Sequence, residues 1–234
     1  MKTFLTDPDE AVTGIVSGST VLIGGFGRAG QPMQLIEALL RTDVTDLTVV
    51  NNNAGNGDEG LALLIGRGHV RKMICSFPRQ SDSWHFDEAY RNGRVELELV
   101  PQGTLAERIR AGGAGIGGFF TPTGYGTPLV EGKETRVIDG RGYVFEVPIT
   151  GDVALIRAFK ADRAGNLVYR KTARNFGPVM AMAAATTIVE VSEILNNEYL
   201  DPESVVTPGI FTNVIVNVGP SSRGSQMIRS GVQE

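Results

Sequence analysis

Residues 20–32 read TVLIGGFGRAGQP, and this stretch decides the fold. Its first four residues include three apolar ones in a row, which is typical of a strand buried on both faces of a parallel sheet. A glycine-rich loop over 24–30 follows, and Pro32 then opens a predicted helix. The apolar side of that helix is formed by Leu35, Ile36, Leu39 and Leu40. A strand, a glycine loop and a helix in this order predict the first unit of an α/β protein.

The same alternation continues on both sides of this unit. A helix is predicted from Pro8 to Gly18 because Asp7 and Pro8 form an N-terminal capping signal. Further strands are predicted at 46–50, 70–76 and 95–100, and further helices at 59–66, 84–91 and 104–111. Strands that alternate with helices predict an open, mostly parallel sheet with helices on both faces.

The second half of the chain does not continue the regular alternation of strands and helices. Glycine-rich residues 112–134 are predicted to be irregular, and β-hairpins are predicted around the turns at 140–142 and 161–166. A helix at 177–185 and strands at 187–191 and 213–218 complete the expected elements. One domain is expected over residues 1–218, and the polar tail 219–234 is predicted to be disordered.

Composition excludes several classes of protein. The net charge of -4 and a pI near 5.4 argue against a nucleic-acid partner. No apolar run reaches the roughly 18 residues of a membrane helix, and the N-terminus carries no signal-peptide pattern. Cys75 is the only cysteine, so a cytoplasmic setting is the default. The whole sequence contains one cysteine and two histidines, which is too few for an ordinary Cys/His zinc site, so no metal is predicted.

The glycine loop contains G-x-G-x-x-G at 25–30, a pattern that can hold a phosphate against a helix N-terminus. A dinucleotide site also needs an acidic residue where the second strand ends. Asn51, Asn52 and Asn53 occupy that place instead, so NAD binding is not favoured. The glycines either bring the backbone close to another ligand or serve only a tight turn.

Amide side chains follow two of the predicted strands. Asn52 and Asn53 end the second strand, and Gln102 follows the fourth. Ligands bind at the carboxyl ends of parallel strands, where an amide N–H can stabilise a developing oxyanion. The alternative is that the asparagines only favour a turn.

The loop after the third strand offers a different set of donors. Arg79 with Gln80 and Ser81 forms a plausible clamp for a carboxylate, although a solvated surface arginine is the ordinary alternative. Cys75, inside the preceding strand, is expected in the core.

Several motifs together resemble the α subunits of family I CoA-transferases. They are GGFGRAGQP at 24–32, NNAG at 52–55, PQGTLAERIRAGG at 101–113 and TGYGT at 123–127. The stretches CSFPRQSDS at 75–83 and ARNFGP at 173–178 resemble the members that act on 3-oxoadipate.

The resemblance implies ping-pong transfer of CoA from succinyl-CoA to a 3-oxo acid, and 3-oxoadipate is the expected acceptor. In that family a glutamate of the β subunit, in a Glu-Asn-Gly motif, forms a glutamyl-CoA thioester. This chain contains no such tripeptide, so the nucleophile is expected on a partner β subunit, in an α₂β₂ heterotetramer.

The resemblance also implies roles for single residues. Asn52 and Gln102 are expected to position substrate and oxyanion, and Asn53, Arg79, Gln80 and Ser81 to bind substrate. Gly24, Gly25, Phe26, Gly27, Arg28, Ala29 and Gly30 are expected to face CoA, which is a co-substrate; no permanently bound cofactor is expected. The expected partners are thus the β subunit, succinyl-CoA and a 3-oxo acid. Neither nucleic acid nor a membrane is expected as a partner.

Other functions remain open at this point. An acetate or acetoacetate CoA-transferase α subunit is the nearest alternative. Related α/β folds also serve as sugar-phosphate isomerases and as effector-sensing modules of transcription regulators, and a fold alone does not decide between them.

Overall fold

The structure is a computed structural model that describes residues 2–196 and 198–220. Its helices are α1 (Pro8–Ala11), α2 (Met33–Leu39), α3 (Gly60–Gly66), α4 (Trp84–Arg91), α5 (Gln102–Gly113) and α6 (Gly177–Ala183). Its strands are β1 (Thr3–Leu5), β2 (Thr20–Ile23), β3 (Leu47–Val50), β4 (Val70–Cys75), β5 (Glu96–Leu99), β6 (Phe119–Thr121), β7 (Thr135–Ile138), β8 (Arg141–Glu146), β9 (Gly151–Ala161), β10 (Leu167–Val168), β11 (Ala184–Ile194) and β12 (Val214–Asn217).

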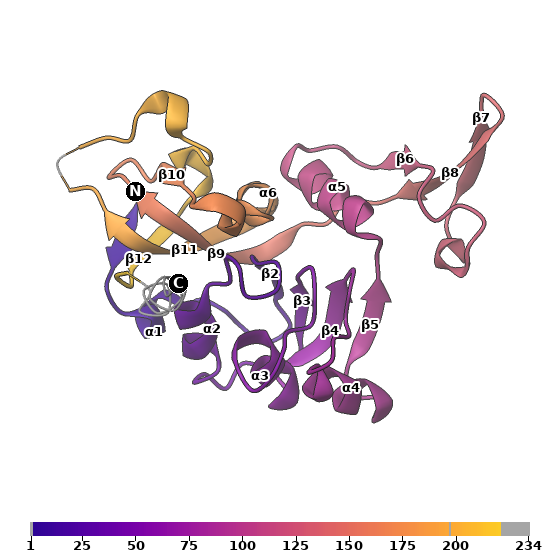
Figure 1. The fold of residues 1–234 in the computed structure, drawn as a ribbon, viewed down its shortest axis with the longest axis horizontal. Coiled ribbons are helices and arrows are strands. Elements are labelled where there is room, and N and C mark those ends of the chain that lie inside the picture. Colours follow the sequence, from indigo (N-terminus) through magenta and orange to yellow (C-terminus); the bar gives the residue numbers. More distant parts are fainter. Residues whose placement is uncertain (1, 197, 221–234) are drawn as a thin grey trace, which may run out of the picture.

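The central sheet has the strand order β1-β12-β11-β9-β2-β3-β4-β5, and all neighbours along this path are parallel (Figure 1). The strand β10 lies off this path and pairs with β9 in the antiparallel direction. From β2 the chain runs outward through β3, β4 and β5, and β9 then returns to the other side of β2. The order of strands therefore reverses at β2, where open α/β sheets place their ligands.

Helices cover both faces of this sheet, as the alternation of strands and helices predicts. Helices α1 to α4 lie on one face, and α5 and α6 lie on the other (Figure 1). Each face has its own cluster of buried apolar residues. Because β2 is packed between the two clusters, Leu22 faces one of them and Ile23 the other, and both are 0% exposed.

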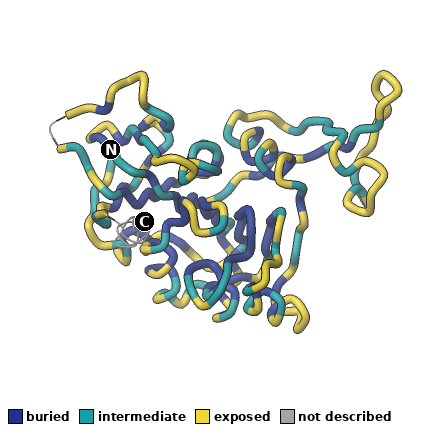
Figure 2. The backbone as a smooth tube through the Cα atoms, in the orientation of Figure 1, coloured by how far each residue is buried: buried dark blue, intermediate teal, exposed yellow. Residues whose placement is uncertain are grey.

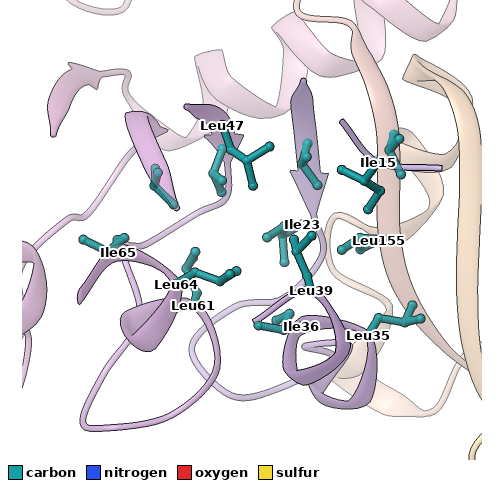
Figure 3. Packing of buried hydrophobic residues seen from close by; sticks show 14 of the residues in the cluster. Ile15, Ile23, Leu35, Ile36, Leu39, Leu47, Leu61, Leu64, Ile65 and Leu155 are labelled. Carbon is teal, nitrogen blue, oxygen red and sulfur yellow. The ribbon is translucent and has the colours of Figure 1, made fainter. Parts of the chain in front are cut away.

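The packing under α2 and α3 follows the helical period. Leu35, Ile36 and Leu39 of α2 lie beside Leu61, Leu64 and Ile65 of α3, near Ile23 of β2 and Leu155 of β9 (Figure 3). These side chains recur at intervals of three and four residues, which places them on one side of each helix. Burying each of them contributes roughly 1.5–3 kcal/mol to folding. This packing holds the loops at the carboxyl end of the sheet.

A small antiparallel sheet, in the order β6-β8-β7, projects away from the central sheet (Figures 1 and 2). Its root is held by Arg108 of α5, whose Nη1 donates to Glu98 Oε1 at 2.8 Å and whose Nε donates to the Val147 carbonyl at 2.7 Å. Glu146 lies beside Arg108 and accepts from Lys133 at 2.7 Å. Arg108 and Glu146 are both buried, and each also has a second partner of opposite charge, Glu98 and Lys133, so a network of ion pairs holds this root.

The predicted fold class, a mostly parallel α/β sheet with hairpins in the second half, is confirmed. Several boundaries differ from the prediction, and strand β6 lies within the stretch 112–134 that is predicted to be irregular. The first helix ends at Ala11 and not at Gly18, and turns follow it. Helix α6 ends at Ala183 because the next residues already pair with β9. A single domain over 1–218 stays a prediction. Of the tail 219–234 that is predicted to be disordered, residues 221–234 lie outside the described residues.

Candidate active site

The carboxyl ends of β2, β3, β4 and β5 enclose a cavity of about 390 Å³, which we call the amide cavity. It is lined by Phe26, Gly27, Asn52, Asn53, Ser76, Phe77, Gln80 and Gln102. Three of the four side-chain amides come from residues that directly follow strands or begin a helix. The parallel register brings them together although they are up to 50 positions apart in sequence.

Asn51 has a structural role. It is fully buried, its Nδ2 donates to the Ile23 carbonyl at 2.6 Å, and its Oδ1 accepts from the Asn53 amide at 2.9 Å. These contacts join the end of β2 to the end of β3. Asn51 therefore sets the positions of the two asparagines that follow it.

Asn52 is held by the loop after β4. Its carbonyl accepts from the amides of Ser76 and Phe77, both at 3.1 Å. Its side-chain Oδ1 accepts from Ser76 Oγ at 2.8 Å. Asn52 Nδ2 donates to no group within residues 2–196 and 198–220, so its N–H donors are left for a ligand in the cavity.

The other amides in the cavity are less constrained. Asn53 Oδ1 accepts from the Gly55 amide at 3.3 Å, which leaves its Nδ2 available. Gln102 is the first residue of α5, and its exposed side chain makes no hydrogen bond in the described part of the chain. Gln80 accepts from Asn56 Nδ2 through its Oε1.

The glycine loop forms one wall of the cavity. The amides and carbonyls of Phe26 and Ala29 bond to each other at 3.0 and 3.2 Å, which makes a tight turn. Gly25 adopts a φ of 128°, and a Cβ there would lie 2.5 Å from Gln31 Cγ. The loop therefore needs glycine for its shape as well as for access. Arg28 points to Glu59, with Nη2 to Oε1 at 2.9 Å.

The helix amides beside the glycine loop are already occupied. Glu190 of β11 accepts through Oε2 from the amides of Gln34 and Leu35 at 2.8 and 3.3 Å. Its Oε1 accepts from Arg157 Nη1 at 2.9 Å. Burial raises the pKa of Glu190 to about 7, and Arg157 and the two amides oppose this shift. An internal carboxylate thus fills the place where a dinucleotide-binding protein holds phosphate.

Two predicted substrate-binding residues lie outside the amide cavity. Arg79 Nε lies 2.6 Å from Asp87 Oδ1, and the arginine side chain is half exposed. Ser81 is exposed and does not line the cavity. Cys75 is buried at the end of β4, and burial raises the pKa of its thiol to about 12, so it is not a nucleophile at neutral pH.

The amide cavity can therefore stabilise a negative charge but cannot attack a carbonyl. Its polar side chains are amides and one hydroxyl, and none of its lining residues is Asp, Glu, Cys or His. Within the described ranges no group of three or more His, Cys, Asp or Glu side chains could hold a metal ion, and no helix could span a membrane. A nucleophile for this cavity has to come from another source.

Sequence reasoning missed three residues that shape this site: Ser76, Asn175 and Glu190. Ser76 and Asn175 lie inside the two motifs 75–83 and 173–178, which on their own indicate no role for either residue. Glu190 could have been noticed as a lone acid in the apolar strand TTIVEV. No local pattern indicates its two backbone amide partners, because Gln34 and Leu35 lie more than 150 positions away.

Comparisons with known proteins agree with this geometry. The family model described as coenzyme A transferase matches residues 5–217. The chain is 60% identical over 216 residues to the A-type subunit of the 3-oxoadipate CoA-transferase of Pseudomonas putida, covering 92% of this chain and 94% of that one. It is 49% identical over 228 residues to the A-type subunit of the succinyl-CoA:3-ketoacid coenzyme A transferase of Xanthomonas campestris pv. campestris (strain B100), covering 96% and 93%.

Among solved structures, the glutaconate coenzyme A-transferase of Acidaminococcus fermentans has the same fold. Its TM-score is 0.81 at 22% identity, over 92% of this chain and 75% of that chain.

Proposed function

This chain belongs to the coenzyme A transferase family, and we propose that it is the α subunit of an enzyme that moves CoA from succinyl-CoA to 3-oxoadipate. The observation that carries the proposal is a cavity of neutral amide donors at the switch point of the sheet. The choice of acceptor is supported by 60% identity to a 3-oxoadipate CoA-transferase chain, against 49% to a 3-ketoacid one.

The proposed reaction is a double displacement. An enzyme carboxylate attacks the succinyl-CoA thioester, which forms a mixed anhydride and releases the CoA thiolate. The thiolate then attacks the enzyme's carbonyl carbon in that anhydride, giving an enzyme-CoA thioester and free succinate. The acceptor acid reverses these steps. We assign the attacking glutamate to a partner β subunit, because the amide cavity contains no carboxylate and the chain contains no Glu-Asn-Gly motif.

Asn52 and Gln102 act in this proposal as donors to the oxyanion of each tetrahedral intermediate. Neutral amides suit this role because they stabilise the oxyanion without forming an ion pair with the attacking carboxylate. Asn53 and Gln80 contact the acyl group, and the loop 24–30 faces CoA through Phe26, Gly27 and Ala29.

Arg79 and Ser81 remain candidates for the distal carboxylate of a dicarboxylic acid. Arg79 fits that role only if it exchanges Asp87 for the substrate. A half-exposed arginine can make this exchange at low cost, since surface ion pairs are worth only about 0–1 kcal/mol.

The family uses CoA as a co-substrate, and we propose that the enzyme needs no permanently bound cofactor. Relatives named as A-type subunits imply a second, different subunit. We propose two α and two β chains and a cytoplasmic location.

The test is a CoA-transfer assay with succinyl-CoA and 3-oxoadipate, on this chain alone and on its complex with the β subunit. We expect turnover by the complex and none by the isolated chain. Turnover by the isolated chain would place the nucleophile here, and a complex that is inactive with every 3-oxo acid would reject the function.

An acetate or acetoacetate CoA-transferase is the second candidate, supported by the 49% identity to the 3-ketoacid enzyme. The same assay decides between them. A higher kcat/KM for acetoacetate than for 3-oxoadipate would favour the second candidate.

A further inference from the structure

A second cavity, of about 700 Å³, lies on the other side of Phe26. Its lining residues are Phe26, Ala29, Lys171, Thr172, Arg174 and Asn175, and we call it the cationic cavity. Phe26 lines both cavities, so the glycine loop is the wall between them. One elongated ligand that crosses this loop could reach both.

Two positive charges of the cationic cavity have no ion-pair partner among residues 2–196 and 198–220. Lys171 and Arg174 are exposed, and neither makes an ion pair or side-chain hydrogen bond in the described part of the chain. Many other cations of this acidic protein are paired, including Arg28 with Glu59 beside the same loop. Unpaired cations at the mouth of a cavity raise the local concentration of anions.

Asn175 fixes this cavity to the glycine loop. Its Oδ1 accepts from the Gly25 amide at 3.1 Å, and its Nδ2 donates to the Ala29 carbonyl at 2.9 Å. Gly30 completes the contact, because a Cβ there would lie 2.4 Å from the Ala173 carbonyl oxygen. The two walls are therefore held together by specific contacts between segments about 150 positions apart.

The N-terminus of α2, beside the glycine loop, does not offer positive charge to an anion. Glu190 occupies the Gln34 and Leu35 amides, so α2 offers these donors to no anion. An anion that approaches the glycine loop would instead meet Lys171 and Arg174. The two cavities thus differ in chemistry: neutral amides on one side of Phe26, and cations on the other.

We propose that the cationic cavity binds the phosphates at the nucleotide end of CoA, while the thioester end lies in the amide cavity. This inference rests on the proposed function, because it assumes an acyl-CoA substrate. Coenzyme A has the required asymmetry, with a neutral thioester at one end and a polyanion at the other. Lys171 and Arg174 would each donate to phosphate oxygens.

The test places the double variant Lys171→Ala/Arg174→Ala in the complex with the β subunit. CoA and pantetheine are compared in calorimetric binding, and succinyl-CoA and succinyl-pantetheine in steady-state turnover. We expect the double variant to weaken CoA binding and raise the KM for succinyl-CoA by at least about tenfold. Pantetheine binding and kcat/KM for succinyl-pantetheine should not change, because these ligands lack the nucleotide.

Arg67→Ala is the matched control. Arg67 is an exposed cation at the end of α3 that forms no ion pair within the described residues, so this variant should change neither CoA binding nor the KM for succinyl-CoA.

Three results would overturn the inference. Unchanged CoA binding by the double variant would show that phosphate lies elsewhere. Equal losses with both donors would mean that the cations bind the acyl carboxylate. If the double variant no longer purifies as a complex while Arg67→Ala still does, the two cations bind the β subunit and not CoA.

Failure of the proposed function gives a different pattern. If the unaltered complex transfers CoA to no 3-oxo acid but binds CoA more tightly than the double variant, the function is rejected and the phosphate site stands. If the unaltered complex does not bind CoA, both are rejected.

Discussion

Ser76 Oγ lies 2.8 Å from Asn52 Oδ1, so a hydroxyl at the end of β4 orients an amide at the end of β3. Replacing Ser76 by Ala removes this contact and lets the amide rotate. We expect kcat to fall about three- to tenfold, the worth of one net hydrogen bond, with little change in KM. Steady-state kinetics of the complex measure this. Ser204→Ala is the control, since Ser204 is exposed outside the cavity and its hydroxyl also donates one hydrogen bond, to the Asp201 carbonyl at 2.8 Å. Equal effects of the two changes would contradict the orienting role.

Asn52 and Gln102 should contribute more than Ser76 because they touch the reacting group. Asn52→Ala and Gln102→Ala each remove one oxyanion donor, which typically costs on the order of 10²–10³ in rate. We expect kcat to fall by that factor while KM changes little. If both variants retain the kcat of the unaltered complex, the donors have been assigned wrongly.

Arg79 is tested by the difference between two acceptor acids. Only 3-oxoadipate has a distal carboxylate, and the bound acid would bury its pair with Arg79. Loss of one member of a buried, hydrogen-bonded charge pair costs roughly 2–5 kcal/mol, or at least about 30-fold. Arg79→Ala should lower kcat/KM for 3-oxoadipate by that factor and spare acetoacetate. Arg91→Ala is the matched control, because Arg91 also pairs with Asp87, at 3.5 Å. Equal losses for both acids would remove Arg79 from the site.

Glu190 gives a pH dependence of stability. Its pKa rises from 4.5 to about 7 on folding, because burial disfavours its charged form despite Arg157. The folded state therefore binds this proton more tightly, and its contribution to stability is present below pH 4.5 and is lost as the pH rises through 7.

The matching variant is Glu190→Gln. Between pH 4.5 and 7.5 the unfolding free energy of the unaltered protein should fall relative to that of the variant by on the order of 3 kcal/mol. Urea unfolding across this range measures the difference. Parallel pH curves for the two proteins would mean that Glu190 stays ionised when folded.

Cys75 should be inert in the folded protein. Its thiol is buried and its pKa is raised to about 12, so almost no thiolate exists at pH 8. A thiol reagent at pH 8 should label Cys75 only in denaturant. Without denaturant, treatment with the reagent should leave the rate of CoA transfer unchanged. Rapid labelling of the native complex would contradict the burial of this strand end.

The sequence predicts this fold well where the signals are local. The helix at 84–91 has the predicted bounds, and the strand at 20–23 is correct to the residue. It fails where pairing is distant: β1 is only three residues long and depends on β12, some 210 positions later. Pairing of an edge strand with the other end of the chain leaves no periodic pattern in so short a segment.

The site shows the same division. Asn52, Asn53 and Gln102 could be placed from the rule that strand ends meet at one edge of a parallel sheet. The ion pair of Arg79 with Asp87 could not, because it depends on how the loop after β4 folds back on α4. The contacts of Asn175 with Gly25 and Ala29 likewise arise only when the sheet has assembled.

The central claim is that this chain supplies the cavity and its partner supplies the nucleophile. The most direct measurement is intact-mass analysis of the complex after incubation with succinyl-CoA and no acceptor, followed by peptide mapping. We predict an unmodified mass for this chain and a CoA adduct on a glutamate of the β subunit. A CoA adduct on any carboxylate of this chain would contradict the account.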